Sequence, residues 1–117
     1  MANINIIKGS SFLFQGEIKG LPTDAKLGST NVTASAEFYI SGTYQKEGAA
    51  KVKVEKAQMN TSANDNTFSC YVDTASLGTG TLACAMTIEY PNPLGTGNIK
   101  EIIPVTINDP IKVNALS

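Results

Sequence analysis

The segment that decides the fold is Leu82-Ala83-Cys84-Ala85-Met86-Thr87-Ile88-Glu89-Tyr90. Its large side chains fall at every even position, and small or polar side chains fall at the odd positions between them. Successive side chains of a strand point to opposite faces, so this period of two predicts a strand with one buried face. No segment of the chain shows a convincing helical period. We therefore expect an all-β protein.

The same alternation recurs along most of the chain. The pattern predicts strands, in chain order, at Asn3–Lys8, Phe12–Ile18, Val32–Ile40, Val52–Val54, Phe68–Val72, Thr81–Tyr90 and Ile99–Ile107. Short strands separated by turn-forming residues are typical of an immunoglobulin-like antiparallel β-sandwich, here of about seven strands. The length of 117 residues suits a single domain over residues 1–117. Its core strands span about residues 3–107, and residues 108–117 form a C-terminal tail.

Four local features carry more specific expectations. Gly16 interrupts a strand and predicts a bulge or bend there. The polar strand around Lys53 favours an edge position, because charge protects an edge from pairing with another chain. Pro104 cannot donate to a ladder, so its strand should lie at an edge or be bulged. The segment Asp73–Gly78 suits a single helical turn, with Asp73 or Thr74 as its cap.

Composition argues against several classes of function. The net charge is −1 and charged residues make up only 16% of the chain, so there is no electrostatic footprint for nucleic acid. The chain has no histidine, which removes the usual general base and the commonest zinc ligand. No apolar stretch approaches the roughly 20 residues of a membrane helix. We expect no enzymatic activity, no catalytic residue, no cofactor, no metal, and neither nucleic acid nor a membrane as a partner.

The two cysteines, Cys70 and Cys84, both fall on apolar strand faces. The chain begins without the basic start and apolar core of an export signal, so we expect synthesis on the cytoplasmic side and reduced, buried thiols. Such thiols should resist large thiol reagents. Because both face inward, a disulfide between them stays open as the alternative.

Candidate interface residues come from two parts of the sequence. Tyr39, Tyr44 and Tyr71 are candidate surface aromatics, and outward tyrosines are enriched at protein interfaces. The alternative is that tyrosine is there simply because it favours strands.

The second group of candidates lies in the tail, which keeps Ile111, Val113 and Leu116 beyond the last predicted strand. We interpret these residues as docking against a neighbouring subunit, and the alternative is that the tail packs on its own domain. Glu101 is a separate question, because it falls on the apolar face of its strand and needs a partner if it is buried. That partner would be a lysine, in an ion pair or even in a lysine–asparagine crosslink. A frayed strand end with an exposed Glu101 remains the simpler alternative.

Several short motifs resemble one known group of proteins. They are Lys8-Gly9 after the first strand, Ala36-Glu37-Phe38-Tyr39-Ile40, Leu77-Gly78-Thr79-Gly80-Thr81-Leu82 before the long strand, and the closing Val105-Thr106-Ile107. Over about residues 4–107 the chain resembles the immunoglobulin-like modules of tailed-phage virion proteins. The comparison extends to the N-terminal domain of baseplate upper proteins and to small capsid auxiliary or head-fibre proteins of phages of Bacteroides-type hosts.

The resemblance implies a non-enzymatic structural protein of a virion. Because the module accounts for the whole chain given, we expect a capsid auxiliary (decoration) or head-fibre component that docks on other virion proteins. The resemblance also implies a homo-oligomer or many copies in one assembly, and no shared catalytic residues. Two alternatives remain: a tail or baseplate accessory module, or a carbohydrate-binding or adhesin-like surface sandwich.

Six side chains fall on the inward-facing positions of their predicted strands, and this leads to a stability prediction. They should form one core: Phe38, Phe68, Cys84, Met86, Ile88 and Val105. Replacing Phe38 with alanine should lower the free energy of unfolding by about 3–5 kcal/mol, as expected for a buried phenylalanine. Urea denaturation measures this loss. A loss below about 1 kcal/mol, typical of surface positions, would contradict the burial of Phe38.

Overall fold

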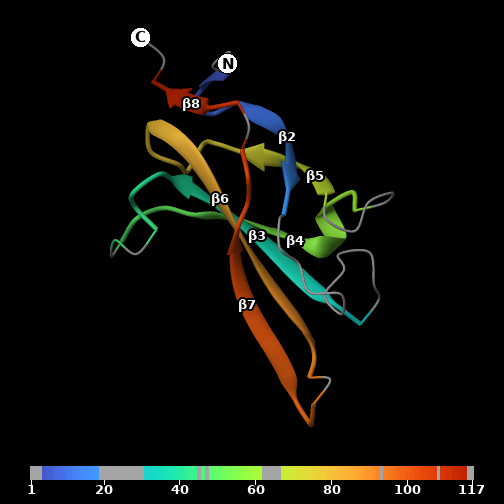
Figure 1. Cartoon of the computed structure of the whole chain (residues 1–117). Coiled ribbons are helices and arrows are strands. Elements are labelled where there is room, and N and C mark those ends of the chain that lie inside the picture. The colour runs from blue at the N-terminus through green and yellow to red at the C-terminus, as the bar shows by residue number, and fades with distance from the viewer. Residues whose placement is uncertain are drawn as a thin grey trace.

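The computed structural model describes residues 4–18, 31–44, 46, 48–61, 67–92, 94–107 and 109–115. Eight strands and a short 3-10 turn make up its regular structure (Figure 1). They are β1 (Ile4–Ile7), β2 (Ser11–Glu17), β3 (Thr33–Ile40), β4 (Val52–Glu55), η1 (Lys56–Gln58), β5 (Thr67–Asp73), β6 (Gly80–Pro91), β7 (Asn98–Pro104) and β8 (Ile111–Asn114). The described residues contain no α-helix, as the missing helical period predicts.

Strand β6, which contains the segment quoted first, is the centre of the larger sheet. The order of that sheet is β1-β8-β6-β3-β4, and β7 also pairs with β6. Strand β3 pairs along one edge of β6, whereas β8 and β7 share the other edge, at Gly80–Thr81 and Ala85–Pro91. The β6–β7 hairpin extends away from the rest of the molecule (Figure 1). The smaller sheet consists of β2 and β5, which are antiparallel.

The neighbours in each sheet agree with an immunoglobulin-like sandwich. In that fold strands B and E are neighbours in one sheet, and strands C, F and G lie in the other with C′ beside C. Here β2 and β5 take the places of B and E, and β3, β4 and β6 take those of C, C′ and F. Strands β7 and β8 together take the place of G. The predicted fold class is confirmed, with one strand more than predicted.

One pair of strands departs from the predicted antiparallel arrangement. Strand β1 runs parallel to β8, with Ile4 opposite Ile111 and Ile6 opposite Val113. Figure 1 shows the two chain ends side by side at this pair. Alternation predicts which face of a strand is buried, but it carries no information about the strand's neighbour or direction. Sequence pattern therefore could not reveal a parallel pair.

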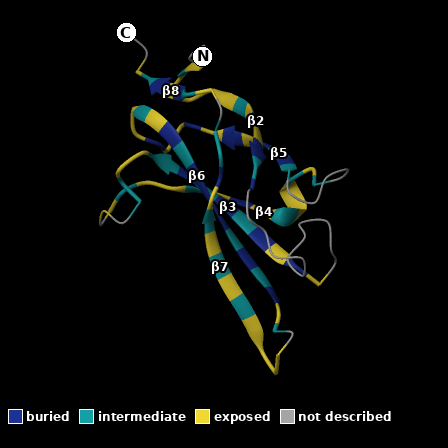
Figure 2. Ribbon diagram, viewed as in Figure 1, coloured by how far each residue is buried: buried dark blue, intermediate teal, exposed yellow. Residues whose placement is uncertain are grey.

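The core lies between the two sheets and matches the predicted parity. All six predicted core side chains are buried, with exposed fractions of at most 7%. Figure 2 shows buried residues at intervals along β6 and β3. The ring of Phe14 on β2 packs edge-on against Phe38 on β3, with 4.9 Å between ring centroids, and lies 5.8 Å from the ring of Phe68. These three rings join the smaller sheet to the larger one.

The edge predictions hold, but the bulge at Gly16 does not. Strand β4 ends the larger sheet, and Pro104 is exposed on β7, whose ladder pairs with β6 alone among the described strands. Gly16 instead pairs regularly with Phe68. A Cβ atom at Gly16 would lie 2.6 Å from the Phe14 ring and 2.8 Å from a methyl carbon of Val105. Glycine is required there because the core leaves no room for a side chain.

The segment after β5, for which we predicted a helical turn, is a non-helical turn. Its hydrogen bonds hold the connection between β1 and β2. The Asp73 carboxylate accepts a hydrogen bond from the N–H of Ala75 at 2.9 Å, as a cap would, but no helix follows. Thr74 is fully buried, and its hydroxyl donates to the Ser10 carbonyl at 2.7 Å and accepts from the Gly9 N–H at 3.0 Å. Its hydrogen bonds therefore fix the connection between β1 and β2 instead of starting a helix.

The predicted docking role of the tail is wrong for Ile111 and Val113. Residues 111–114 form β8, which pairs with β1 and with the start of β6. Both side chains are buried in the chain's own core, so neither is available at the surface. Leu116 lies outside the described residues. Apolar residues continue past residue 107 because β8, which belongs to the larger sheet, is formed only at residues 111–114.

This correction leads to a prediction for β8. Val113→Ala should lower the free energy of unfolding by about 1–3 kcal/mol, because it removes buried methyl groups and leaves a cavity. Lys112→Ala is the matched control, since Lys112 lies on the same strand with an exposed side chain, and it should change stability by less than about 0.5 kcal/mol. Urea denaturation compares the two variants. Equal effects would show that β8 does not belong to the core.

Candidate functional site

Two exposed apolar side chains meet on the outer face of the smaller sheet. Leu13 of β2 stands directly opposite Tyr71 of β5 in the antiparallel register. Their exposed fractions are 46% and 69%. Directly opposed residues have Cβ atoms about 4.5–5.5 Å apart, so the two side chains form one continuous apolar surface. We call this pair the Leu13–Tyr71 patch.

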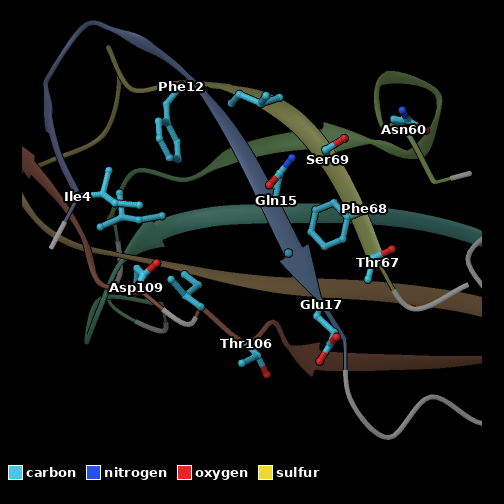
Figure 3. Close-up of a pocket in the computed structure, with 14 residues that line it drawn as sticks. Ile4, Phe12, Gln15, Glu17, Asn60, Thr67, Phe68, Ser69, Thr106 and Asp109 are labelled. Carbon is cyan, nitrogen blue, oxygen red and sulfur yellow. The ribbon is translucent and has the colours of Figure 1, made fainter. Parts of the chain in front are cut away.

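A groove of about 560 Å³ runs beside the patch, along β2 (Figure 3). Leu13, Gln15 and Glu17 line it from β2, and Thr106, Ile107 and Asp109 line it from the segment between β7 and β8. Figure 3 shows Glu17 and Thr106 at one end of the groove, and Ile4 and Phe12 toward the other. The N–H of Thr106 donates to the Glu17 carbonyl at 3.0 Å, and this bond joins β2 to that segment.

The other two predicted tyrosines form a separate cluster in which the Tyr44 hydroxyl already has a hydrogen-bond partner. Tyr39 and Tyr44 pack edge-on with ring centroids 4.8 Å apart, and the Lys51 ammonium lies 4.7 Å from the centre of the Tyr44 ring. The Tyr44 hydroxyl donates to Glu37 at 3.0 Å, and this bond is the main reason that the pKa of Tyr44 is raised. Burial raises the pKa of Tyr39. Both rings are half-buried, so the cluster holds the segment after β3 against the sheet and offers little surface to a partner.

Glu101 has a hydrogen-bond partner in the neighbouring strand. The hydroxyl of Tyr90 donates a hydrogen bond to its carboxylate at 2.8 Å. The register places Glu101 opposite Ile88, so Tyr90 is its diagonal neighbour on the same face of the β6–β7 hairpin. A carboxylate on an apolar face is thus accommodated by a hydroxyl donor, and the alternative of a frayed, exposed end is wrong.

Both cysteines are buried and free, as expected. Cys70 comes from β5 and Cys84 from β6, so the two thiols face the core from opposite sheets. Burial raises the pKa of Cys70 to about 11. It also raises the pKa of Cys84, and nearby Cys70 and Glu37 add to that effect. Neither thiol therefore forms the reactive thiolate at neutral pH.

The described residues contain no cluster of three or more metal-ligating side chains. They also contain no helix that is long and apolar enough to cross a membrane. Every buried side-chain nitrogen or oxygen among them has a hydrogen-bond partner. Among the described residues, Leu94 and Ile102 are also more exposed than Leu13, but Leu13 and Tyr71 are the two exposed large apolar side chains that stand opposite each other across a ladder.

Comparison with protein-family models, with curated proteins and with solved structures finds no match.

Sequence reasoning singled out Tyr71 but missed its partner. Leu13 lies between Phe12 and Phe14, on the outward parity of its strand, and an apolar residue at an outward position was the available signal. The patch could not be assembled from that signal alone, because β2 and β5 are distant in the sequence. The three tyrosines also fall into two places, since Tyr71 lies on the smaller sheet and the other two lie on and just after β3.

The state of the thiols is directly testable. A bulky maleimide at neutral pH should label neither Cys70 nor Cys84 in the folded protein and both in urea, because burial blocks access and keeps the thiols protonated. Mass spectrometry counts the labels. Rapid labelling of the folded protein would contradict the burial. A mass two daltons lower, with no label even in urea, would instead reveal a disulfide.

Proposed function

We propose that this chain is a non-enzymatic structural protein of a tailed-phage virion, a capsid auxiliary or head-fibre component that acts by docking on other virion proteins. The resemblance to virion modules suggests the setting. The observation that carries the docking role is the Leu13–Tyr71 patch, in which two large apolar side chains are exposed side by side. Clustered exposed apolar groups mark interaction sites more often than scattered ones do.

The chemistry around the patch supports a protein as the partner. Ser11, Gln15, Thr67 and Ser69 share its face and are neutral, whereas the two carboxylates of that face, Asp73 and Glu17, lie at opposite ends of the ladder. Neutral polar groups cost less to desolvate than charges, and charged residues are depleted at the centre of protein interfaces whereas tyrosine is enriched there. A tyrosine with an apolar neighbour, neutral polar groups around it and charges only at the ends fits this pattern. The same composition suits many identical copies that bind a repeated surface.

The experiment asks whether the protein is in the particle and whether the patch holds it there. Phage particles are purified by density gradient from the cells that make this chain, and antibodies locate it by immunoelectron microscopy. We expect labelling on the head. Labelling on the tail would support the baseplate alternative, and absence of the protein from purified particles would overturn the proposal.

A variant tests the patch itself. Leu13→Thr with Tyr71→Thr should leave stability nearly unchanged, because threonine favours strands and both sites are exposed. The same variant should weaken docking about 30-fold or more, the effect of losing an interface hot spot. Ile102→Thr is the matched control, since Ile102, on β7 of the other sheet, has an exposed fraction between those of Leu13 and Tyr71. If only the control variant is lost from particles, the docking face is on the larger sheet and the patch assignment is wrong.

A further inference from the structure

One edge of β2 carries backbone groups that no strand of the described residues uses. In an antiparallel pair, residues alternate between those that bond to the partner strand and those that point away from it. The Glu17 carbonyl bonds to Thr106, on the side away from β5, so Gln15 and Leu13 point the same way. Ser69, opposite Gln15, confirms this alternation because it bonds outward to Asn60. Within the described residues, the N–H and C=O of Leu13 and Gln15 have no hydrogen-bond partner.

The topology explains why this edge is open. In the immunoglobulin-like arrangement with strands A, B, E and D in one sheet, strand A covers the outer edge of B. Here β2 takes the place of B, but the first strand β1 pairs with β8 in the other sheet. The segment after β7 touches β2 at Thr106 and then turns away to form β8. The groove in Figure 3 is lined by this segment and by β2, and also by Asn60, Thr67, Phe68 and Ser69 on the β5 side.

The open edge also lacks the usual protection against an added strand. Natural edge strands are short or carry lysine, proline or a bulge. Strand β4 has Lys53, β7 has Pro104, and β1 is only four residues long. Strand β2 has seven residues, no lysine or proline, and an unbroken register with β5.

The charged and apolar side chains that line the groove indicate which kind of peptide segment fits it. Its lining contains two carboxylates, Glu17 and Asp109, and no lysine or arginine. Its apolar walls include Ile4, Phe12 and Ile107. A strand that lies here places alternate side chains into the groove and away from it. The complementary segment therefore has apolar side chains at alternate positions and at least one basic side chain.

We propose that β2 accepts an extended, basic segment of another protein as an added strand, which pairs with the backbone of Leu13 and Gln15 and places its basic side chains near Glu17 and Asp109. This inference rests on the proposed docking function and describes how that docking occurs. Backbone pairing supplies affinity in such complexes, and the groove supplies specificity. The added strand also extends the sheet beside the Leu13–Tyr71 patch, so the edge and the patch form one interface.

The first experiment uses a probe peptide and the isotope-labelled full chain. The probe is a short synthetic peptide of alternating valine and threonine with a lysine at each end. In an NMR titration up to millimolar peptide, we expect shifts and slowed hydrogen exchange at the amides of Leu13 and Gln15. The amides of β4 serve as the internal control and should not change. If the two β2 amides show no response, the proposal is wrong.

Two further comparisons separate backbone pairing from charge attraction. A peptide methylated on the backbone nitrogens along one edge cannot pair with β2 through that edge, so methylation of one edge or the other should abolish binding. Glu17→Gln with Asp109→Asn should weaken the lysine peptide about tenfold, the combined effect expected of two surface charge pairs. Glu55→Gln on β4 is the matched control and should bind as the unaltered chain does. Equal binding by all three proteins would overturn the assignment of a basic partner.

The result also distinguishes this inference from the proposed function. If purified particles contain the protein but the peptide does not bind, docking stands and strand addition fails. If the peptide binds but particles lack the protein, the open edge is a binding site in a different setting. Exchange protection of Leu13 and Gln15 that rises with protein concentration, without peptide, would identify a second copy as the occupant and contradict a basic partner.

Discussion

The contact of the Phe14 ring with Phe38 holds the two sheets of this protein together. The smaller sheet has two strands, and an isolated two-stranded pair is marginally stable in water. It persists because the Phe14 ring packs against Phe38 of the larger sheet, with 4.9 Å between ring centroids. The Phe68 ring of the smaller sheet is buried beside it, 5.8 Å from the centroid of Phe14. Gly16 is part of the same constraint, since any side chain there would enter the space of these rings.

This packing determines which face of β2 is buried, but it leaves one backbone edge of β2 unpaired among the described residues. The core packing positions Phe12, Phe14 and Gly16, which point inward, and the ladder with β5 uses the backbone of the same residues. The intervening residues Leu13 and Gln15 consequently direct both their side chains and their backbone groups away from the core and from β5. The hydrogen bonds of Thr74 at one end and Thr106 at the other hold the strand in place. A rigid strand with an open edge loses little entropy when another strand adds to it.

Exposure of an aromatic residue, by contrast, is a poor guide to an interface in this chain. Tyr39 and Tyr44 are partly exposed, yet their rings contact each other, and Glu37 and Lys51 already satisfy Tyr44. A partner would have to compete with those contacts. Tyr71 lies beside Leu13, whose apolar side chain forms no hydrogen bond with which a partner would compete. The difference lies in the neighbouring side chains, which decide whether a surface tyrosine already has polar and aromatic contacts.

The sequence by itself determined which side chains are buried along the strands that it predicted. Alternation in Val32–Ile40 and Thr81–Tyr90 predicted the buried face correctly, because strand geometry is local and one register shift would invert every side chain. Charge at Lys53 and the missing donor of Pro104 likewise identified edge strands from single residues.

Only the tertiary structure decided which strands are neighbours. It placed Ile111 and Val113 in the core, paired β1 with β8 in parallel, brought Tyr90 to Glu101 and set Leu13 opposite Tyr71. Each of these contacts joins different strands, and the period of a strand says nothing about what lies beside it. The open edge of β2 is such a property, because it exists only where the first strand pairs with the other sheet.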